Sequence, residues 1–261
     1  MAIYKVKDKQ TIAPLFAGWD EGCIWSCLQD CMGVAYADDL QTPRCAAIFL
    51  GEFLFFAGDA KDELVRNKPK ECTSDFVILV PGSEAWEESI ERVYGTRATR
   101  IMRYATKKEE GVFREAYLQE IVSGLSPAYE LRAVDEELYD KTKTMEWSRA
   151  SCGNYASYET YQKYALGIAI LKENEPVSIA STYTHFNHGI EIEIDTREDE
   201  RRKGHAAVSG AKLILECLKR DLYPSWDALN KGSLAVAKKL GYEFAREYVS
   251  YEVADFLYTR K

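Results

Sequence analysis

In the second half of the chain, the spacing of the apolar residues changes from one typical of a strand to one typical of a helix. From residue 189 to 195 the sequence alternates strictly, with isoleucine on one face and acid on the other: Ile190, Ile192 and Ile194 against Glu191, Glu193 and Asp195. This period of two predicts a strand with one buried face. From Ala206 to Arg220 the apolar residues recur at helical spacing, which predicts a helix directly after the strand.

The turn between this strand and helix is basic and contains a glycine, in the order Arg201-Arg202-Lys203-Gly204. The first backbone N–H groups of a helix have no partner within the helix, and the helix dipole favours negative charge there. Gly204 lets a ligand approach the backbone closely. The turn therefore suits a phosphate or pyrophosphate, although many glycine turns of this kind bind nothing.

The rest of the second half predicts alternating strands and helices. Besides the strand and helix above, we expect strands at 129–134, 167–171, 176–183, 222–227 and 244–253, and helices at 135–145, 158–164 and 230–240. The second and third of these strands form a hairpin across residues 172–175. Gly241 follows the last helix as its C-cap.

The first half predicts a second α/β region. We expect helical structure over residues 1–40, a hairpin over 46–58, a strand at 75–80, a helix from Ser83 to Gly95 and a helix at 107–122. The sequence Ser123-Gly-Leu-Ser-Pro127 interrupts the helical pattern and marks the preferred domain boundary. The expected domains are residues 1–125 and 126–261.

The two halves resemble each other loosely, since each contains a hairpin, a strand, a helix closed by glycine and a final strand. The first half has Pro81-Gly82-Ser83-Glu84 where the basic turn would stand, which places acid where a phosphate needs base. We interpret the first half as a degenerate duplicate that lost the anion site. The alternative is a coincidence between two α/β modules of similar length.

Cysteine and histidine do not predict a metal site. Cys23, Cys27 and Cys31 lie four residues apart, so they would line one stripe of a helix. A metal or redox cluster is one explanation of that stripe, but core packing is favoured because buried cysteine behaves as a small apolar residue. His185 and His188 lie in a loop without a carboxylate-rich motif, so no metal is expected.

Composition narrows the class of protein and of partner. The 261 residues are 46% hydrophobic and 29% charged, which is typical of a soluble globular protein. A net charge of -8 argues against nucleic acid as a partner. The sequence has neither the layout of a signal peptide nor an apolar run long enough for a membrane span, so we expect a cytoplasmic protein without a membrane partner.

Two motifs in the second half resemble those of the GNAT superfamily of N-acetyltransferases. Arg201, Gly204 and Ala206 match the pyrophosphate motif Gln/Arg-x-x-Gly-x-Gly/Ala of that superfamily. A second feature, an asparagine with a small residue three positions on and then Lys-x-Gly-aromatic, is matched by Asn230, Ser233, Lys239, Gly241 and Tyr242. The whole chain looks like a bacterial branch of these proteins with an extra N-terminal domain. The implied fold is a mixed, mostly antiparallel sheet flanked by helices, preceded by a second α/β domain.

The resemblance implies acetyl-coenzyme A as the acetyl donor, with no metal. Backbone N–H groups from Arg202 to Ala207, including His205, would hold the pyrophosphate, with help from the charges of Arg201, Arg202 and Lys203. Backbone groups of Ile194 and Thr196 would pair with the pantetheine arm. Asn230 and Ser233 would hydrogen-bond its amides or a phosphate. Asn230 is also a plausible helix N-cap, and the two roles are compatible.

The implied chemistry is direct attack of an amine on the thioester. Glu191 and Glu193 project from the central strand and are the candidate bases, although a solvated or salt-bridged strand face explains each of them equally well. The superfamily often places a tyrosine acid seven residues after the asparagine, where this chain has Ala237. A different tyrosine (Tyr183, Tyr242 or Tyr248) or water would then protonate the thiolate, or turnover would be slow or absent.

Three functions remain open from the sequence. The first is an acetyl-CoA-dependent N-acetyltransferase acting on a primary amine of a small molecule or peptide, as a monomer or homodimer. The resemblance implies that acetyl-coenzyme A binds in a groove where the strand at 189–195 separates from the strand at 222–227. Acidic residues near this groove would steer a cationic amine toward it. The second is a non-catalytic acyl-CoA-binding sensor or scaffold, which Ala237 favours. The third is a structural protein without a ligand, which the two co-spaced motifs disfavour.

Overall fold

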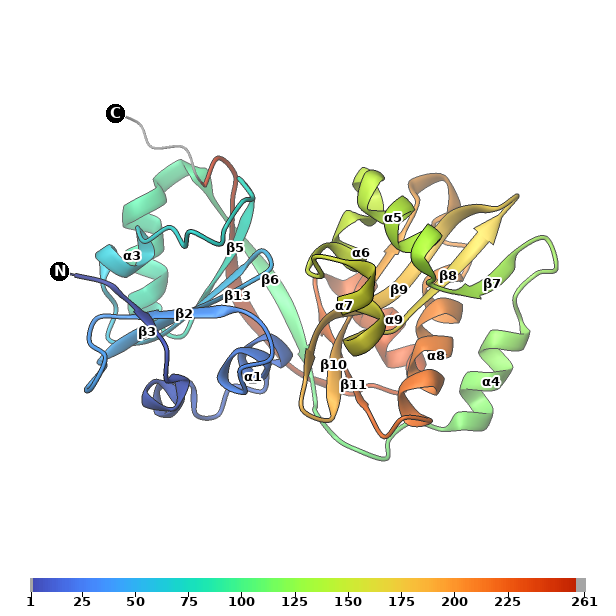
Figure 1. The fold of residues 1–261 in the computed structure, drawn as a ribbon, viewed down its shortest axis with the longest axis horizontal. Coiled ribbons are helices and arrows are strands. Elements are labelled where there is room, and N and C mark those ends of the chain that lie inside the picture. Colours follow the sequence, from blue (N-terminus) through green and yellow to red (C-terminus); the bar gives the residue numbers. More distant parts are fainter. Residues whose placement is uncertain (1, 257–261) are drawn as a thin grey trace. The chain divides into compact units, whose positions relative to one another are not determined.

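The computed structural model describes residues 2–256, and these form two compact units (Figure 1). Among these residues, the first unit consists of 2–103 and 247–256, and the second of 104–246. The chain passes from one unit to the other within two long strands, β6 (Ala98–Thr106) and β13 (Phe244–Val253). The boundaries of these units therefore differ from those of the domains predicted from the sequence, 1–125 and 126–261. Those domains stay a prediction.

The first unit contains a mostly antiparallel sheet with the strand order β1-β2-β3-β4-β5-β13-β6. The strands not yet given are β1 (Tyr4–Val6), β2 (Val34–Ala37), β3 (Cys45–Leu50), β4 (Phe53–Gly58) and β5 (Val77–Pro81). Strands β3 and β4 form the expected hairpin, in which Gly51 adopts a positive φ of 61°. Strands β4 and β5 are parallel.

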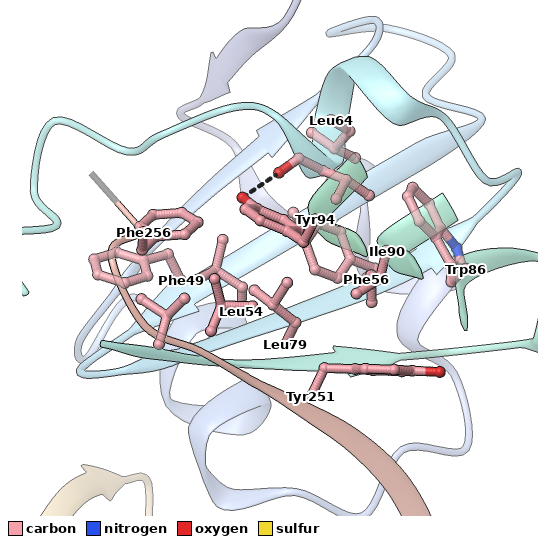
Figure 2. Packing of buried hydrophobic residues seen from close by; sticks show 14 of the residues in the cluster. Phe49, Leu54, Phe56, Leu64, Leu79, Trp86, Ile90, Tyr94, Tyr251 and Phe256 are labelled. Carbon is pink, nitrogen blue, oxygen red and sulfur yellow. Dashed lines mark hydrogen bonds between the residues drawn. The ribbon is translucent and has the colours of Figure 1, made fainter. Parts of the chain in front are cut away.

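Helix α3 (Glu84–Tyr94) begins after Ser83 and ends at Gly95, as the sequence predicts. Its apolar residues lie at helical spacing, so Trp86, Ile90 and Tyr94 face the sheet and are buried in the core of this unit (Figure 2). The Tyr94 hydroxyl donates a hydrogen bond of 3.1 Å to the carbonyl of Val65, which ends the short helix α2 (Asp62–Val65).

The prediction of helical structure over residues 1–40 is wrong for most of that range. Only α1 (Gly22–Leu28) is α-helical, with two 3-10 turns (Lys9–Thr11 and Ala13–Phe16) before it and strands β1 and β2 on either side. Cys23 and Cys27 are buried on α1, in agreement with core packing. Asp30 has a φ of 59°, which ends the helical path, so Cys31 does not continue the stripe.

The second unit contains a five-stranded sheet with the order β11-β10-β9-β8-β7. Its strands are β7 (Glu130–Ala133), β8 (Gly167–Lys172), β9 (Glu175–Phe186), β10 (Gly189–Thr196) and β11 (Tyr223–Ser225). All neighbours are antiparallel except β10 and β11, which are parallel. Strand β12 (Asp227–Ala228) pairs with the end of β6. The predicted hairpin of β8 and β9 and the predicted central strand β10 are confirmed. Burial along β10 does not alternate as expected: residues 189–192 are buried and residues 193–196 are partly buried, whichever face they occupy.

Helices cover both faces of the five-stranded sheet. The helices of this unit are α4 (Glu115–Ser123), α5 (Glu136–Thr144), α6 (Arg149–Gly153), α7 (Tyr158–Tyr164), α8 (His205–Leu218) and α9 (Lys231–Leu240). The side chain of Ile194 lies against Gly210 of α8, whereas the adjacent Asp195 accepts a hydrogen bond of 3.4 Å from Ser151 of α6. Neighbouring residues of a strand point to opposite faces, so α8 and α6 lie on opposite sides of β10 (Figure 1).

Both sheets repeat one local topology: a hairpin, a helix and then a parallel strand. In the second unit this is β9-β10-α8-β11, and in the first it is β3-β4-α2-β5. The counterpart of the basic turn is therefore the segment before α2, not the sequence Pro81 to Glu84, which precedes α3. Because α2 has only four residues, its N-terminus offers little of the helix dipole that an anion site requires.

No helix in residues 2–256 is long and apolar enough to cross a membrane. Within the same residues, no cluster of three or more histidine, cysteine, aspartate or glutamate side chains has the arrangement of a metal site.

Candidate functional site

Strand β10 loses one of its two neighbours halfway along its length. It pairs with β9 from Gly189 to Thr196, but with β11 only from Gly189 to Glu191. From residue 192 onward, the β11 side of β10 has no strand partner among the described residues. An extended ligand with amide groups can pair with such an edge as an added strand, and Ile194 and Thr196 were expected to bind in this way.

The pairing of β10 with β9 is irregular at the same place. The register shifts between Glu191 and Ile192, which pair with Thr184 and Thr182, so Tyr183 is the extra residue of a bulge. A bulge increases local twist and bends the strand. The irregularity accompanies the separation of β10 from β11 and leaves Glu191 where the two strands part.

The basic turn has the backbone geometry that the sequence predicts for an anion site. Gly204 precedes α8 with a φ of 88°, and a Cβ at this position would meet no atom within 4 Å. Arg202 also has a positive φ, of 62°. In the described part of the chain, the backbone N–H groups of residues 202–206 have no hydrogen-bond acceptor. The prediction is wrong for Ala207, whose N–H donates a hydrogen bond of 3.1 Å to the carbonyl of Gly204. A run of such groups at a helix N-terminus can bind a phosphate.

The three basic side chains of the turn do not all have the same surroundings. Lys203 donates a hydrogen bond of 2.7 Å to the carboxylate of Glu200. The guanidinium of Arg201 donates one of 3.2 Å to the carbonyl of Thr196, so this carbonyl is bound within the protein. Arg202 is exposed. The three basic residues thus lie together in the turn, and the charge of Lys203 is partly neutralised by the carboxylate of Glu200.

Glu200 is a feature of the site that the sequence reasoning missed. Only 1% of its surface is exposed, and its carboxylate has four partners. These are Lys203 at 2.7 Å, the Tyr129 hydroxyl at 2.8 Å, Lys172 at 3.1 Å and His205 Nε2 at 3.3 Å. The hydrogen bond from Lys203, together with the other donors, holds the pKa of this carboxyl well below its usual range. In the sequence, Glu200 is one of seven consecutive charged residues at 197–203, and no local pattern indicates that this one is buried.

Glu191 lies at the vertex where β10 and β11 separate. It is 5% exposed, and its Oε1 accepts a hydrogen bond of 2.8 Å from the backbone N–H of Asp227. Its Oε2 is buried and has no hydrogen-bond partner among the described residues. Burial raises the pKa of Glu191, while the charge of Lys108 opposes that rise. A carboxylate with a raised pKa and one unoccupied oxygen can act as a general base.

Glu193, the second candidate base, has a different environment. It lies two residues further along β10, is only partly buried and is beyond the last residue that pairs with β11. The structure therefore distinguishes the two acids by burial. The carboxylate of Glu191 is fixed in the corner between the strands by the N–H of Asp227.

Asn230 and Ser233 stand together at the start of α9. The Asn230 Oδ1 accepts a hydrogen bond of 2.9 Å from the backbone N–H of Ser233, which confirms Asn230 as the N-cap. The Ser233 hydroxyl accepts one of 3.3 Å from the Trp226 indole. The cap anchors the start of α9 beside residue 226, just after β11 ends. A contact between these two side chains and a coenzyme stays a prediction.

The residues named as possible acids differ in availability. Ala237 is fully buried in the core. The hydroxyl of Tyr242 donates a hydrogen bond of 2.5 Å to the carbonyl of Pro224, and burial raises its pKa. Tyr248 belongs to the first unit, and Tyr183 is buried at the bulge of β9. Of these tyrosines, Tyr242 is hydrogen-bonded to the backbone of β11 through its hydroxyl.

A separate pocket of about 430 Å³ lies beside the start of β10 and the end of α8. It is lined by Glu110, Gly111, Phe113, His188, Leu218, Asp221, Leu222, Tyr223 and Pro224. None of these residues was predicted to bind the acetyl donor or to act in catalysis. The pocket is therefore distinct from the turn at residues 201–204.

Known proteins are similar to this chain over most of its length. A family model described as GNAT acetyltransferase matches residues 13–251. The chain is 25% identical over 237 residues to YdfB of Bacillus subtilis (strain 168), an uncharacterized N-acetyltransferase, covering 84% of this chain and 85% of that protein. A GCN5-related N-acetyltransferase-like protein from Streptococcus suis 89/1591 is 41% identical in sequence. Its crystal structure matches with a TM-score of 0.89, covering 95% of this chain and 98% of that one.

A more distant match concerns the fold alone. A tandem GNAT protein from the clavulanic acid biosynthesis pathway is 10% identical, with a TM-score of 0.53. The alignment covers 97% of this chain and 99% of that chain. The likeness extends over both units of the chain and agrees with the topology that the two sheets repeat.

Proposed function

This chain belongs to the GNAT acetyltransferase family, and on that basis we propose that it is an N-acetyltransferase that uses acetyl-CoA. The acceptor is a primary amine of a small molecule or peptide. The amine attacks the thioester directly, without an acetylated enzyme. The family membership supports acetyl transfer, and the site described above supports the donor.

One observation supports this proposal: the unpaired edge of β10 precedes the basic turn in the chain. The edge extends from Ile192 to the end of β10 at Thr196, and the free N–H groups begin at Arg202, six residues after β10 ends. A ligand with amide groups at one end and a pyrophosphate at the other fits this order of features. Acetyl-CoA has that chemistry, and the open space around Gly204 leaves room for its phosphates.

Glu191 would receive the proton of the attacking amine, directly or through one water molecule. Its carboxylate is held in place by the N–H of Asp227, and its free Oε2 is the acceptor that remains. As the amine nitrogen forms a bond to the acetyl carbon, the bond from carbon to sulfur breaks and the thiolate leaves. Glu193 remains the second candidate, less suited because it is more exposed.

In this proposal the leaving thiolate takes its proton from solvent. Tyr242 is bound to Pro224, and Ala237 stands where the family often has a tyrosine. A thiol has a pKa of about 8.5, so water can protonate its anion near neutral pH without a dedicated acid. The reaction would then proceed, but without the rate advantage of a positioned acid.

The second candidate function is an acyl-CoA-binding sensor or scaffold that does not turn over. Ala237 favours it, because the position of the family's tyrosine is filled by a buried methyl group. Both functions require the anion-binding turn and the edge of β10. They differ only in whether an amine consumes the bound acetyl group.

Calorimetric titration of the purified protein with acetyl-CoA tests the shared requirement, and thiol release against a panel of amines separates the two functions. Binding with amine-dependent thiol release is the expected result. Binding without release across the panel would favour the sensor. Absence of binding would contradict both functions and the assignment of residues 201–206. A cytoplasmic location and a monomeric or homodimeric state stay predictions.

A further inference from the structure

We infer that Glu200 is a positioning residue that holds the anion-binding turn in the conformation that accepts the pyrophosphate. This inference rests on the proposed function, because it assigns a role within the same site. Glu200 itself faces inward and would not contact the ligand, since its side chain is 2% exposed.

The carboxylate of Glu200 joins elements that are far apart in the sequence. Tyr129 immediately precedes β7, Lys172 ends β8, and His205 is the first residue of α8. Their contacts with one carboxylate tie the N-terminus of α8 to the edge of the sheet that lies away from β11. The rings of Tyr129 and His205 also pack edge to face, with centroids 4.4 Å apart.

The hydrogen bonds to Glu200 fix the direction of the turn at residues 201–204 as well as its position. Glu200 stands just before the turn and His205 just after it, so both ends of residues 201–204 are bound to the same carboxylate group. Lys203, inside the turn, is held by the same oxygen as His205. With these anchors, the N–H groups of residues 202–206 are oriented before a ligand arrives, which reduces the ordering required on binding.

Two effects of Glu200 on an anionic ligand oppose each other. Its negative charge, close behind the turn, weakens attraction for a pyrophosphate and partly neutralises Lys203. Its hydrogen bonds preorganise the turn, which strengthens binding. We expect positioning to dominate, because the carboxylate charge is already balanced by Lys172 and Lys203. Removing the carboxylate charge would leave the partly buried Tyr129 hydroxyl and the buried His205 ring with a weaker acceptor.

The test compares Glu200→Gln with the wild type, using two acetyl donors. S-acetyl-pantetheine carries the thioester and the amide arm but no pyrophosphate, whereas acetyl-CoA carries all three. For Glu200→Gln we expect the KM and Kd for acetyl-CoA to rise about tenfold, as is typical for loss of a charged hydrogen-bond acceptor. The kcat should remain unchanged. The KM for S-acetyl-pantetheine should also remain unchanged. Glu198→Gln changes an exposed glutamate two residues before Glu200, in the same 3-10 turn, and is the matched control with no change expected for either donor.

The outcomes separate the inference from the proposed function. If wild-type protein binds neither donor, the proposed function fails. If Glu200→Gln binds acetyl-CoA as well as or better than the wild type, the inference fails and the charge effect dominates. Equal losses for both donors would also overturn it, because they would indicate general damage. Should Glu200→Gln not fold, Tyr129→Phe removes one donor to the same carboxylate and should weaken only acetyl-CoA, by about threefold.

Discussion

The backbone N–H of Asp227 donates a 2.8 Å hydrogen bond to Oε1 of Glu191, at the point where backbone pairing between β10 and β11 stops. The last paired residues are Glu191 and Ser225, so the side chain of Glu191 supplies the next link between the two segments. A carboxylate takes the place that a strand carbonyl would occupy. The corner of the groove is thereby closed by the same group that we propose as the base.

Replacing Glu191 with glutamine should leave acetyl-CoA binding intact and lower kcat by about a hundredfold or more, the range of a lost general base. Glutamine keeps an oxygen for the N–H of Asp227, so the corner should keep its geometry. Steady-state thiol release and calorimetric titration measure the two effects separately.

Glu193→Gln provides the comparison, since it changes the same chemical group two residues away on β10. We expect its kcat to fall by no more than about threefold, as for a partly exposed residue that orients rather than transfers a proton. A larger loss in Glu193→Gln than in Glu191→Gln would exchange the roles of the two acids.

The pH dependence of kcat/KM should report the ionisation of Glu191. Burial raises the pKa of this carboxyl, and the charge of Asp227 adds to the rise while that of Lys108 opposes it. The base acts in its ionised form, so activity should fall as the pH drops through a value above about 4.3, the usual pKa of glutamate. If the residual activity of Glu191→Gln falls at the same acidic pH as that of the wild type, the ionisation belongs to a group other than Glu191.

The free energy of unfolding should also depend on the ionisation of Glu191, but with the opposite sign: it should fall as the pH rises, whereas activity should increase. The folded state binds the proton of Glu191 more tightly than the unfolded state, since the folded pKa is the higher one. Between the two pKa values the folded state therefore carries more protons, and the free energy of unfolding falls as the pH rises. Denaturant titrations at several pH values should show a shallower decline for Glu191→Gln than for the wild type.

Substitution of Gly204 by glutamate should reduce acetyl-CoA affinity by about a hundredfold. A carboxylate at the helix N-terminus repels the pyrophosphate, and the left-handed backbone at a φ of 88° disfavours any side chain. Gly204→Ala introduces the same backbone strain without the charge, and a Cβ there meets no atom within 4 Å. Its affinity should therefore lie much closer to that of the wild type.

Gly95 offers a matched control in the first unit. It has a φ of 54°, and a Cβ there would also meet nothing within 4 Å. Gly95→Glu should lower the free energy of unfolding by at least as much as Gly204→Glu does, at least about 1 kcal/mol, because Gly95 has a ψ of -129° and lies outside the left-handed helical region that Gly204 occupies. Acetyl-CoA binding should be retained. Equal losses of binding in both variants would show that strain alone explains the effect.

The elements that carry the site follow from local rules. The alternation from Gly189 to Asp195 and the change of period after Gly204 determine β10 and α8, and Asn230 and Gly241 bound α9 with cap geometry. These signals are strong because each depends only on neighbours within one or two turns. The basic turn before α8, with Gly204 in the left-handed conformation, could be predicted for the same reason.

The two features that the sequence did not predict depend on distant partners. Glu200 is buried because Tyr129, just before β7, and Lys172, at the end of β8, both bind its carboxylate, and no local sequence pattern indicates such a pairing. Glu191 and Glu193 have identical spacing in the strand, and only the end of the β11 pairing makes one of them buried. Residues 1–40 were misjudged because a cysteine stripe within one short helix was extended over flanking strands.

In the first unit, Asp62 should contribute measurably to stability. Its carboxylate accepts hydrogen bonds from Arg92 at 2.7 Å and from Ser89 at 2.7 Å, which lower its pKa to about 2 and join α2 to α3. Asp62→Ala should lower the free energy of unfolding by about 1–2 kcal/mol after solvent screening of the exposed Arg92. Thermal or denaturant unfolding measures this difference.

The contribution of Asp62 should disappear in acid. Because the folded pKa is the lower one, the stabilisation is complete above about pH 4, the pKa of an unfolded aspartate, and is lost as the pH falls toward about 2. Glu88→Ala, an exposed change on α3, should shift stability by no more than about 0.5 kcal/mol. A difference between wild type and Asp62→Ala that persists at pH 2 would contradict the ionic origin of the effect.

The division of the chain has a consequence for biosynthesis. Strand β13 pairs with β5 through Tyr251 and Val253, and these two side chains and Phe256 are at most 1% exposed within the core of the first unit (Figure 2). During translation, residues 1–103 leave the ribosome with one edge of β5 unpaired and the core incomplete. Residues 104–246 form a continuous unit that can close as soon as it emerges. The part of the chain made first is therefore the part that finishes folding last.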